Sequence, residues 1–478
     1  MKSVALYNLG CKVNSYEMEV MRQTLQEKGY RIVAFDEKAD IYIVNTCTVT
    51  NIADRKSRQM LHRARQLNSD AVVVAVGCYV QTGLEAVEAD SAIDLAVGNN
   101  RKKDIADILE EYLEKRQEAG GACGGDKTLQ GSTILDIGHT YEYEEARLKR
   151  TAEHTRAYIK IQDGCNQFCS YCAIPYARGR VRSRRQEDIL EEVRGLVDAG
   201  YREVVLTGIH ISSYGIDFGE GGQEAQEGAW AEDGRKREEE KRQPRYDGHS
   251  RLVELVERIH GTDGLERIRL GSLEPRIVTR QATERLAALP KLCPHFHLSL
   301  QSGCDATLKR MNRHYTTGEY YKSVELLREC FHEPAVTTDV IVGFPGETEA
   351  EFAQTREFLE KARFYEMHVF KYSRRAGTAA DAMPDQVPEP VKARRSAELI
   401  AMRERQSKEF RRRYIGKEAE ALLEEVREIG GRTYCIGHTR DYVKAALDIT
   451  DRPQAAASLI NTVARIPVSD FLTDEILM

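Results

Sequence analysis

The chain has 478 residues, of which 41% are hydrophobic and 31% charged, and a formal net charge of −6. This length favours two or three domains. No apolar run approaches the ~20 residues of a membrane span, and the net charge excludes a protein that coats nucleic acid through a uniform positive field. The N-terminus has no secretory signal, so we expect a cytoplasmic protein without a membrane anchor.

Residues 1–113 are expected to form an α/β domain. Apolar runs at 4–6, 41–44 and 72–76 are separated by longer amphipathic segments, a pattern that predicts a parallel, doubly wound sheet. Residues 114–150 are rich in glycine and polar residues and have no periodicity. We interpret them as a linker.

Residues 151–382 are expected to form a partial (β/α)6 barrel of the TIM type. Helical segments alternate with six strand candidates, at 157–162, 203–207, 267–271, 296–300, 336–342 and 367–372. The active site of such a barrel lies at the C-terminal ends of its strands. A Gly-, Glu- and Lys-rich stretch at 218–250 interrupts the pattern and is interpreted as a flexible surface insertion.

Two segments complete the chain. Residues 383–413 include a strongly basic run that predicts a linker helix, either simply solvated or in contact with phosphate. Residues 414–478 contain short alternating segments at 442–447 and 459–466. They predict a small β-barrel.

Three cysteines follow the first barrel strand in a single loop, with the spacing C-x3-C-x2-C: Cys165, Cys169 and Cys172. Three thiolates this close together can hold three irons of a 4Fe–4S cluster and leave the fourth iron open. A structural zinc site would need a fourth protein ligand, and the sequence offers none nearby. The alternatives are therefore an open cluster, a zinc site or accidental clustering, and the open cluster is favoured.

This loop resembles that of the radical S-adenosylmethionine superfamily. The resemblance implies that an electron from the cluster cleaves S-adenosylmethionine into an adenosyl radical. It also implies that residues in the loop and near later strand ends contact the cofactor: Tyr171, Gly208, Ser272, Glu274, Gln301, Arg313 and Gly343. The glycines can equally be turn formers, and Arg313 can equally form a surface ion pair.

Cys11, Cys47 and Cys78 each follow a predicted strand of the first domain. In a parallel sheet with right-handed crossovers, these strand ends share one edge. We therefore expect a second three-cysteine cluster site. Cysteine is also a common buried residue, which is the simpler interpretation.

The second set resembles that of the methylthiotransferase family within the superfamily. The sequence around Cys11, Leu-Gly-Cys-Lys-Val-Asn-Ser-Tyr-Glu, is similar to the branch that acts on N6-threonylcarbamoyladenosine (t6A) at position 37 of tRNA. Residues 414–478 would then correspond to the RNA-binding TRAM domain, although their many acidic residues depart from a basic surface. Branches that act on isopentenyladenosine in tRNA or on a ribosomal-protein aspartate stay open as alternatives.

The resemblance implies two 4Fe–4S clusters, S-adenosylmethionine, an external electron donor, and a monomer that binds the tRNA anticodon loop. The barrel cluster would generate the radical that abstracts hydrogen from carbon-2 of the adenine, and the N-terminal cluster would hold or donate the sulfur. Two basic runs follow cluster cysteines and are candidate phosphate contacts: Arg55, Lys56, Arg58, Arg178, Arg180 and Arg182.

A rival from another class is an electron-transfer or RNA-binding iron–sulfur protein without radical chemistry. Such a carrier needs no open iron, so this interpretation is disfavoured. Cys123, Cys293, Cys304, Cys330 and Cys435 lack ligand spacing and are expected to be free thiols. Of His295 and His297, we expect at most one to face the barrel interior, in a structural role.

Overall fold

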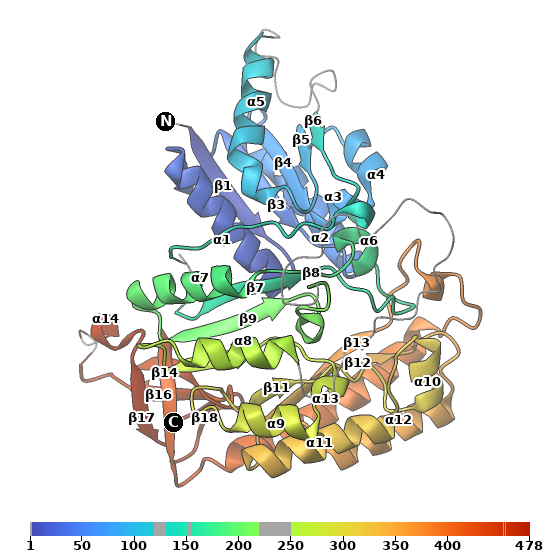
Figure 1. The fold of residues 1–478 in the computed structure, drawn as a ribbon, viewed down its shortest axis with the longest axis vertical. Coiled ribbons are helices and arrows are strands. Elements are labelled where there is room, and N and C mark those ends of the chain that lie inside the picture. The colour runs from blue at the N-terminus through green and yellow to red at the C-terminus, as the bar shows by residue number, and fades with distance from the viewer. Residues whose placement is uncertain (1, 119–130, 151–154, 219–249, 453, 455) are drawn as a thin grey trace.

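The structure is a computed structural model that describes residues 2–118, 131–150, 155–218, 250–452, 454 and 456–478. Most of the expected insertion at 218–250 lies outside the described residues, as does Cys123. Figure 1 shows the N-terminal domain in blue, the central barrel in green to orange, and the C-terminal domain in red. Among the described helices, none is long and apolar enough to cross a membrane.

The N-terminal domain is a six-stranded parallel sheet with the order β2-β1-β3-β4-β5-β6. Its strands are β1 (Ser3–Asn8), β2 (Arg31–Val33), β3 (Ile41–Thr46), β4 (Val72–Gly77), β5 (Leu95–Val97) and β6 (Gly131–Thr133). Its helices are α1 (Lys12–Glu27), α2 (Asn51–Leu67), α3 (Cys78–Thr82), α4 (Leu84–Ala89) and α5 (Ile105–Glu118).

Both faces of this sheet are covered. Along β3, Ile41 and Ile43 pack in a cluster with Met21 of α1, whereas Tyr42 and Val44 pack in a second cluster with α2. Because alternate side chains of a strand point to opposite faces, this sharing confirms the doubly wound sheet. The expected linker at 114–150 differs from its prediction, because α5 extends to Glu118 and β6 pairs with β5. A three-residue edge strand is too short to produce a periodic signal.

The central domain has the six predicted parallel strands. They are β7 (Ala157–Asp163), β9 (Glu203–Gly208), β10 (Arg267–Leu270), β11 (His295–His297), β12 (Ala335–Val342) and β13 (Glu366–Lys371). They form the sheets β10-β9-β7-β8 and β11-β12-β13, where β8 (Arg182–Ser183) is antiparallel to β7. The parallel bridges Ile268–Leu292 and Leu273–Leu298 connect the two sheets. The partial barrel is therefore confirmed.

Helices cover the outside of the barrel: α7 (Gln186–Asp198), α8 (Arg251–His260), α9 (Arg280–Ala287), α10 (Asp305–Arg310), α11 (Thr317–Phe331) and α12 (Glu349–Ala362). The short helix α6 (Ile174–Arg178) lies instead against α3 of the N-terminal domain. On β12, Val336, Val340 and Val342 pack in the main core. The alternate residues, including Asp339, consequently face the barrel interior.

The predicted basic helix is α13 (Glu389–Arg412), which packs along β13. Its inward basic residues are neutralised by the barrel: Arg395 pairs with Glu347 at 2.7 Å and Arg411 with Glu366 at 2.7 Å. This face of α13 is therefore a docking surface within the protein, and only the outward basic residues are available to phosphate.

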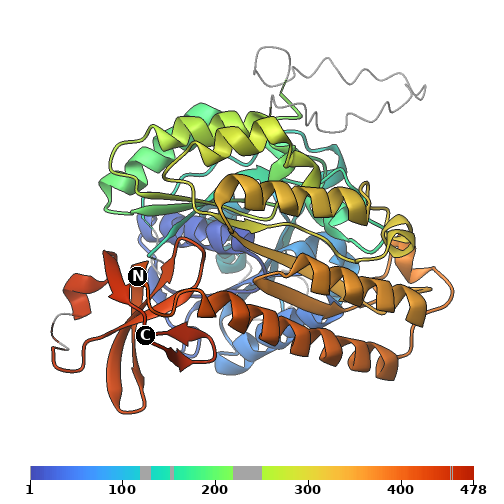
Figure 2. The same cartoon turned by 90° about the horizontal axis from the view of Figure 1, so that it is seen from below.

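The C-terminal domain is a six-stranded, mostly antiparallel sheet with the order β17-β14-β15-β16-β19-β18. Its elements are β14 (Glu418–Ile429), β15 (Arg432–Thr439), β16 (Lys444–Asp448), α14 (Ala456–Leu459), β17 (Val463–Pro467), β18 (Phe471–Thr473) and β19 (Ile476–Leu477). Figure 2 shows this domain against one end of the barrel. There, Arg267 at the start of β10 pairs with Glu420 at 2.9 Å.

Candidate functional site

The barrel cysteines lie in the loop between β7 and α6, at the C-terminal end of the first barrel strand. Gly164 opens this loop with φ +70°, and a Cβ there would lie 1.8 Å from the carbonyl oxygen of Arg180. Only glycine fits this approach. The backbone amide of Cys165 donates to the carbonyl of Gly179 at 3.0 Å. This hydrogen bond fixes the start of the cysteine loop against the C-terminal end of α6.

The three barrel thiols are electrostatic neighbours of one another. Burial raises the pKa of the Cys165 thiol to about 12, and the neighbouring Cys169 adds to the rise. Burial also raises the pKa of Cys172, again with contributions from the other two thiols. Arg313 Nη1 donates to Cys169 Sγ at 3.2 Å. Three thiolates gathered here would repel one another, so the donor set fits a cationic group that they ligate together.

The N-terminal cysteines also converge, although they are far apart in sequence. Cys11 precedes α1, Cys47 follows β3 and Cys78 begins α3 directly after β4. Burial raises the pKa of Cys47 to about 11, and the Cys78 and Cys11 thiols both contribute to the rise. Gly10 has φ +106°, and a Cβ there would come within 3.0 Å of Cys47 Sγ.

Asn99 ties this second site to the barrel. Its amide nitrogen lies 3.5 Å from Cys78 Sγ and donates to the carbonyl of Ala177 in α6 at 2.7 Å. α6 follows the barrel cysteine loop directly. Asn99 therefore links the N-terminal cysteine site to the helix that follows the barrel cysteine loop.

A buried ion network lies at the same boundary. Glu17 of α1 accepts from Arg178 at 2.7 and 2.9 Å, from Lys102 at 2.5 Å and from Lys160 at 2.7 Å. Arg178 and Lys160 also pair with Asp163, at 3.1 and 2.6 Å. Although burial opposes ionisation, Lys160 and Arg178 hold the pKa of the Asp163 carboxyl well below its usual range. The network joins the two domains, because Glu17 of the N-terminal domain pairs with Lys160 and Arg178 of the barrel domain.

The burial of Arg178 and Arg182 corrects their interpretation as phosphate contacts. Both are 1% exposed, and Arg182 donates to the carbonyl of Arg178 at 2.9 Å. Arg180, between them, is exposed and lies 4.7 Å above the ring of Phe168.

The other candidate phosphate contacts lie on the first turns of α2, directly after the Cys47 loop. Arg55, Lys56 and Arg58 are all exposed there. Arg58 donates to the hydroxyl of Tyr79 at 3.4 Å. These residues and Arg180 stay candidates for contact with RNA.

Two of the expected cofactor residues, Glu274 and Arg313, lie beside the barrel cysteines. Glu274 is 3% exposed and pairs with Arg276 at 2.7 Å through one carboxylate oxygen. Its other oxygen, Oε2, is buried without a hydrogen-bond partner among the described residues. Glu274 is an electrostatic neighbour of Cys165 and Arg313. An orphaned carboxylate oxygen at this position fits a ligand that carries an amine.

Tyr171 and Gln301 also line the barrel mouth. Tyr171 is an electrostatic neighbour of Cys169 and Arg313, and its ring lies edge-on to Phe344 at 6.4 Å. Gln301 adopts φ +71° while its amide donates to the carbonyl of Asp339 at 2.9 Å. This left-handed residue lies four positions after the end of β11, where the chain forms an isolated parallel bridge with Val340 of β12.

The remaining expected cofactor residues have simpler roles or none that the structure explains. A Cβ on Gly208 would come within 2.9 Å of Gln162, and a Cβ on Gly343 would come within 2.3 Å of the Lys392 side chain. Close packing therefore accounts for both glycines. Ser272 is exposed, and nothing in its surroundings explains a role.

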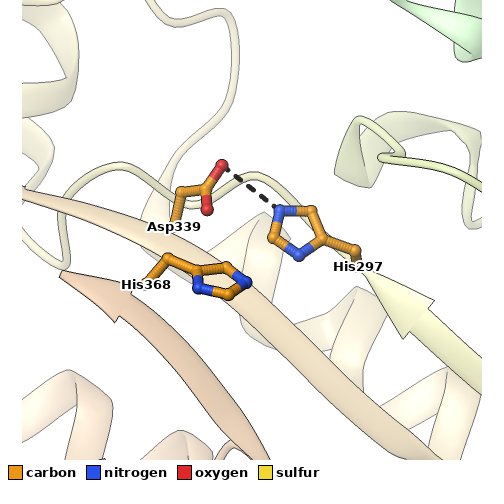
Figure 3. A group of neighbouring side chains, drawn as sticks. All are labelled: His297, Asp339 and His368. Carbon is orange, nitrogen blue, oxygen red and sulfur yellow. Dashed lines mark ion pairs between the residues drawn. The ribbon is translucent and has the colours of Figure 1, made fainter. Parts of the chain in front are cut away.

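One group of side chains in the barrel interior was missed by the sequence reasoning. His297 of β11, Asp339 of β12 and His368 of β13 point toward one another (Figure 3), and their ligand atoms lie within 4.8 Å of one another. His297 Nε2 is 3.3 Å from Asp339, and its Nδ1 is 3.0 Å from the Thr337 hydroxyl. The sequence signal that could have revealed this group is the alternation along β12, where Thr337 and Asp339 lie on the face opposite that of the valines.

The expectation that at most one of His295 and His297 faces inward is wrong. Residues two apart on a strand share a face, and both imidazoles point into the barrel. His295 stacks on Tyr442 of the C-terminal domain at 4.9 Å, whereas His297 contacts Asp339.

Two family profiles match this chain. The radical SAM superfamily matches residues 159–359, and a family described as uncharacterized protein family UPF0004 matches residues 3–98. The first match contains the barrel cysteines and the second contains the N-terminal cysteines.

Characterised relatives match nearly the whole chain. The threonylcarbamoyladenosine tRNA methylthiotransferase MtaB of Bacillus subtilis is 38% identical over 94% of this chain and 91% of its own. The protein of the same name from Aquifex aeolicus is 36% identical over 88% of this chain and 92% of its own. The tRNA-2-methylthio-N(6)-dimethylallyladenosine synthase of Carboxydothermus hydrogenoformans is 34% identical over 88% of each chain.

A solved structure shares the fold. The radical S-adenosylmethionine methyltransferase TsrM from Kitasatospora setae superposes with a TM-score of 0.55 over 80% of this chain and 74% of its own, at 16% identity.

Proposed function

Because the chain belongs to the methylthiotransferase family of radical S-adenosylmethionine enzymes, we propose that it adds a methylthio group to carbon-2 of t6A at position 37 of tRNA. The resemblance inferred from the cysteine motifs is confirmed by these relatives. One structural observation supports the proposal: at the domain boundary, Asn99 connects Cys78 of one three-cysteine set to α6, the helix that follows the loop of the other set. Radical generation and sulfur delivery at one carbon require two such sites close together.

The family uses S-adenosylmethionine and two 4Fe–4S clusters. We assign one cluster to Cys165, Cys169 and Cys172 and the other to Cys11, Cys47 and Cys78. When bound in the barrel, a cluster with an open iron supplies the electron that cleaves S-adenosylmethionine and yields the 5′-deoxyadenosyl radical.

The chain's own residues orient the reactants. Glu274 Oε2 is placed to accept a hydrogen bond from the amino group of S-adenosylmethionine, because it is buried, ionisable and unpartnered. Arg313 donates to Cys169 Sγ and so helps to hold that sulfur in position. Tyr171 covers the site against Phe344 and restricts water.

The N-terminal site is suited to hold the sulfur that is transferred. Cys47 and Cys78 are buried, whereas Cys11 is exposed. The accessible side of this site therefore lies at Cys11, where a base extruded from the anticodon loop can approach. Arg55, Lys56, Arg58 and Arg180 then contact phosphates. We further propose an external electron donor, a monomeric enzyme and a cytoplasmic location.

Nucleoside mass spectrometry of total tRNA tests this function. We expect cells that lack the gene to lose 2-methylthio-t6A and accumulate t6A, and a plasmid copy to restore the product. Loss of the methylthio form of dimethylallyladenosine instead would assign the enzyme to the second branch represented among its relatives. An unchanged nucleoside profile in the deletion strain would contradict a tRNA substrate unless a second enzyme has the same activity, which purified protein and t6A-containing tRNA would reveal.

A further inference from the structure

Tyr442 of the C-terminal domain lies at the N-terminal ends of the barrel strands. Tyr442 stacks on His295 at 4.9 Å and on His438 at 4.5 Å. The guanidinium groups of Arg156 and Arg269 lie 4.9 and 4.8 Å from the same ring. Two arginines and two imidazoles therefore surround the Tyr442 ring.

Most of these cations have an acidic partner. Arg269 pairs with Glu203 at 2.9 Å, and Arg156 pairs with Glu424 at 3.2 Å. His438 is also 2.9 Å from Glu424. The arginines consequently have their charges compensated within the protein and are held in place by those pairs.

Lys12 is different. It begins α1 immediately after Cys11, and α1 lies against β7 and β9 (Figure 1). Its side chain is exposed, yet its electrostatic neighbours include Tyr442, Arg156 and Arg269, and it is also a neighbour of His295. Within the described part of the chain, Lys12 forms no ion pair. One carboxylate, that of Glu203, is also an electrostatic neighbour of Lys12, but Glu203 already pairs with Arg269. Among the described residues Lys12 thus has no ion-pair partner of its own, and it lies between the N-terminal cysteine site and the Tyr442 stack.

A substrate carboxylate would supply such a partner. The threonylcarbamoyl group on N6 carries a carboxylate, whereas the dimethylallyl group in the name of the other relatives is a hydrocarbon. N6 and carbon-2 flank N1 on the same edge of adenine. If carbon-2 faces the sulfur site at Cys11, a group on N6 extends over the residue next to it.

We propose that Lys12 binds the carboxylate of the threonylcarbamoyl side chain and so selects this nucleoside. The inference rests on the proposed function and names the residue that reads the substrate. A neutral side chain would leave the Lys12 ammonium group near Arg156 and Arg269 without an ion-pair partner among the described residues. The same residue therefore both attracts t6A and disfavours its uncharged competitors.

Equilibrium binding of anticodon stem-loops tests this assignment. Fluorescence anisotropy would compare the reconstituted full-length protein on three RNAs, with t6A, the methyl ester of t6A, or unmodified adenosine at position 37. A charge-assisted hydrogen bond predicts that wild type binds t6A about tenfold more tightly than its ester. Lys12→Gln should bind both equally, and Lys12→Arg should keep most of the preference.

Lys38→Gln is the matched control, because Lys38 is an exposed lysine just before β3, at the opposite edge of the sheet. It should preserve the tenfold ratio. Equal binding of t6A and its ester by wild type, or an unchanged ratio in Lys12→Gln, would overturn the assignment. If wild type binds t6A no better than unmodified adenosine, the proposed function itself fails. The ester comparison uses unaltered protein, so misfolding of a variant does not obscure the answer.

Discussion

The two cysteine sites are built in opposite ways. The barrel site is local, because its three cysteines lie within eight consecutive residues of a single loop. The N-terminal site draws on three loops, and its members are separated by 36 and 31 residues in the sequence. A local site depends on the conformation of its loop, whereas a dispersed site depends on the whole sheet that brings its loops together. Three cysteine ligands can therefore be lost as a set for different reasons: a change in one loop at the barrel site, or a change in the packing of the sheet at the N-terminal site.

The largest expected effects separate the chemical roles of the sites. Cys165→Ala should abolish formation of 5′-deoxyadenosine, because it removes a ligand of the proposed cleavage cluster. Cys47→Ala should leave cleavage but stop methylthiolation. Chromatography of 5′-deoxyadenosine and mass spectrometry of the nucleoside measure the two outputs. Equal loss of cleavage in both variants would disprove this division of labour.

Glycines next to each site provide a second test of the difference between the local and the dispersed site. Gly10→Ala places a Cβ within 3.0 Å of Cys47 Sγ at φ +106°, so it should empty the N-terminal site and leave ~4 of ~8 irons. Gly164→Ala places a Cβ 1.8 Å from the Arg180 carbonyl and should empty the barrel site instead. Iron analysis and the presence or absence of S-adenosylmethionine cleavage distinguish the two variants.

Gly29→Ala is the control for backbone strain alone. Its φ is +85°, but a Cβ there has nothing within 4 Å. It should cost about 1 kcal/mol of stability and keep both clusters. Loss of iron in this variant would mean that general destabilisation, rather than contact with Cys47, empties the N-terminal site.

A smaller effect is expected where the sites depend on each other. Arg178→Gln removes the buried cation that pairs with Glu17 and Asp163. The free energy of the first unfolding transition in urea should therefore fall by about 3 kcal/mol. Arg180→Gln, two residues away, removes an exposed cation and should change it by less than about 1 kcal/mol. Equal effects would show that the network does not hold the domains together.

Much of this architecture could be predicted from the sequence. The strand pattern located the six parallel barrel strands, and the C-x3-C-x2-C spacing located a site within one loop. The N-terminal triad required one more step, since each cysteine follows a strand and parallel strands end at one edge. The convergence of Cys11, Cys47 and Cys78 is thus a property of topology that a single sequence can reveal.

Other features could not be predicted because they depend on tertiary partners. Arg178 lies in a run of basic residues that looks solvated, and its partner Glu17 is 161 positions away. Asp339 and His368 approach His297 only when β11, β12 and β13 lie side by side. The error over His295 was of another kind, since the two-residue period of a strand already places it on the same face as His297.

The smallest effect concerns RNA binding beside the dispersed site. Arg55 and Lys56 lie on the first turns of α2, next to the Cys47 loop, whereas Arg63 lies two turns farther along the helix. Changing Arg55 and Lys56 together to Gln should weaken tRNA binding several-fold and reduce the slope of log K against log salt by about 2. Arg63→Gln should change that slope by less than 1, because it is farther from the cysteine edge. Salt titrations of tRNA affinity measure both. If the Arg63 variant matches the double variant per charge removed, α2 contributes only a diffuse field, and the cysteine edge has no specific role in docking the RNA.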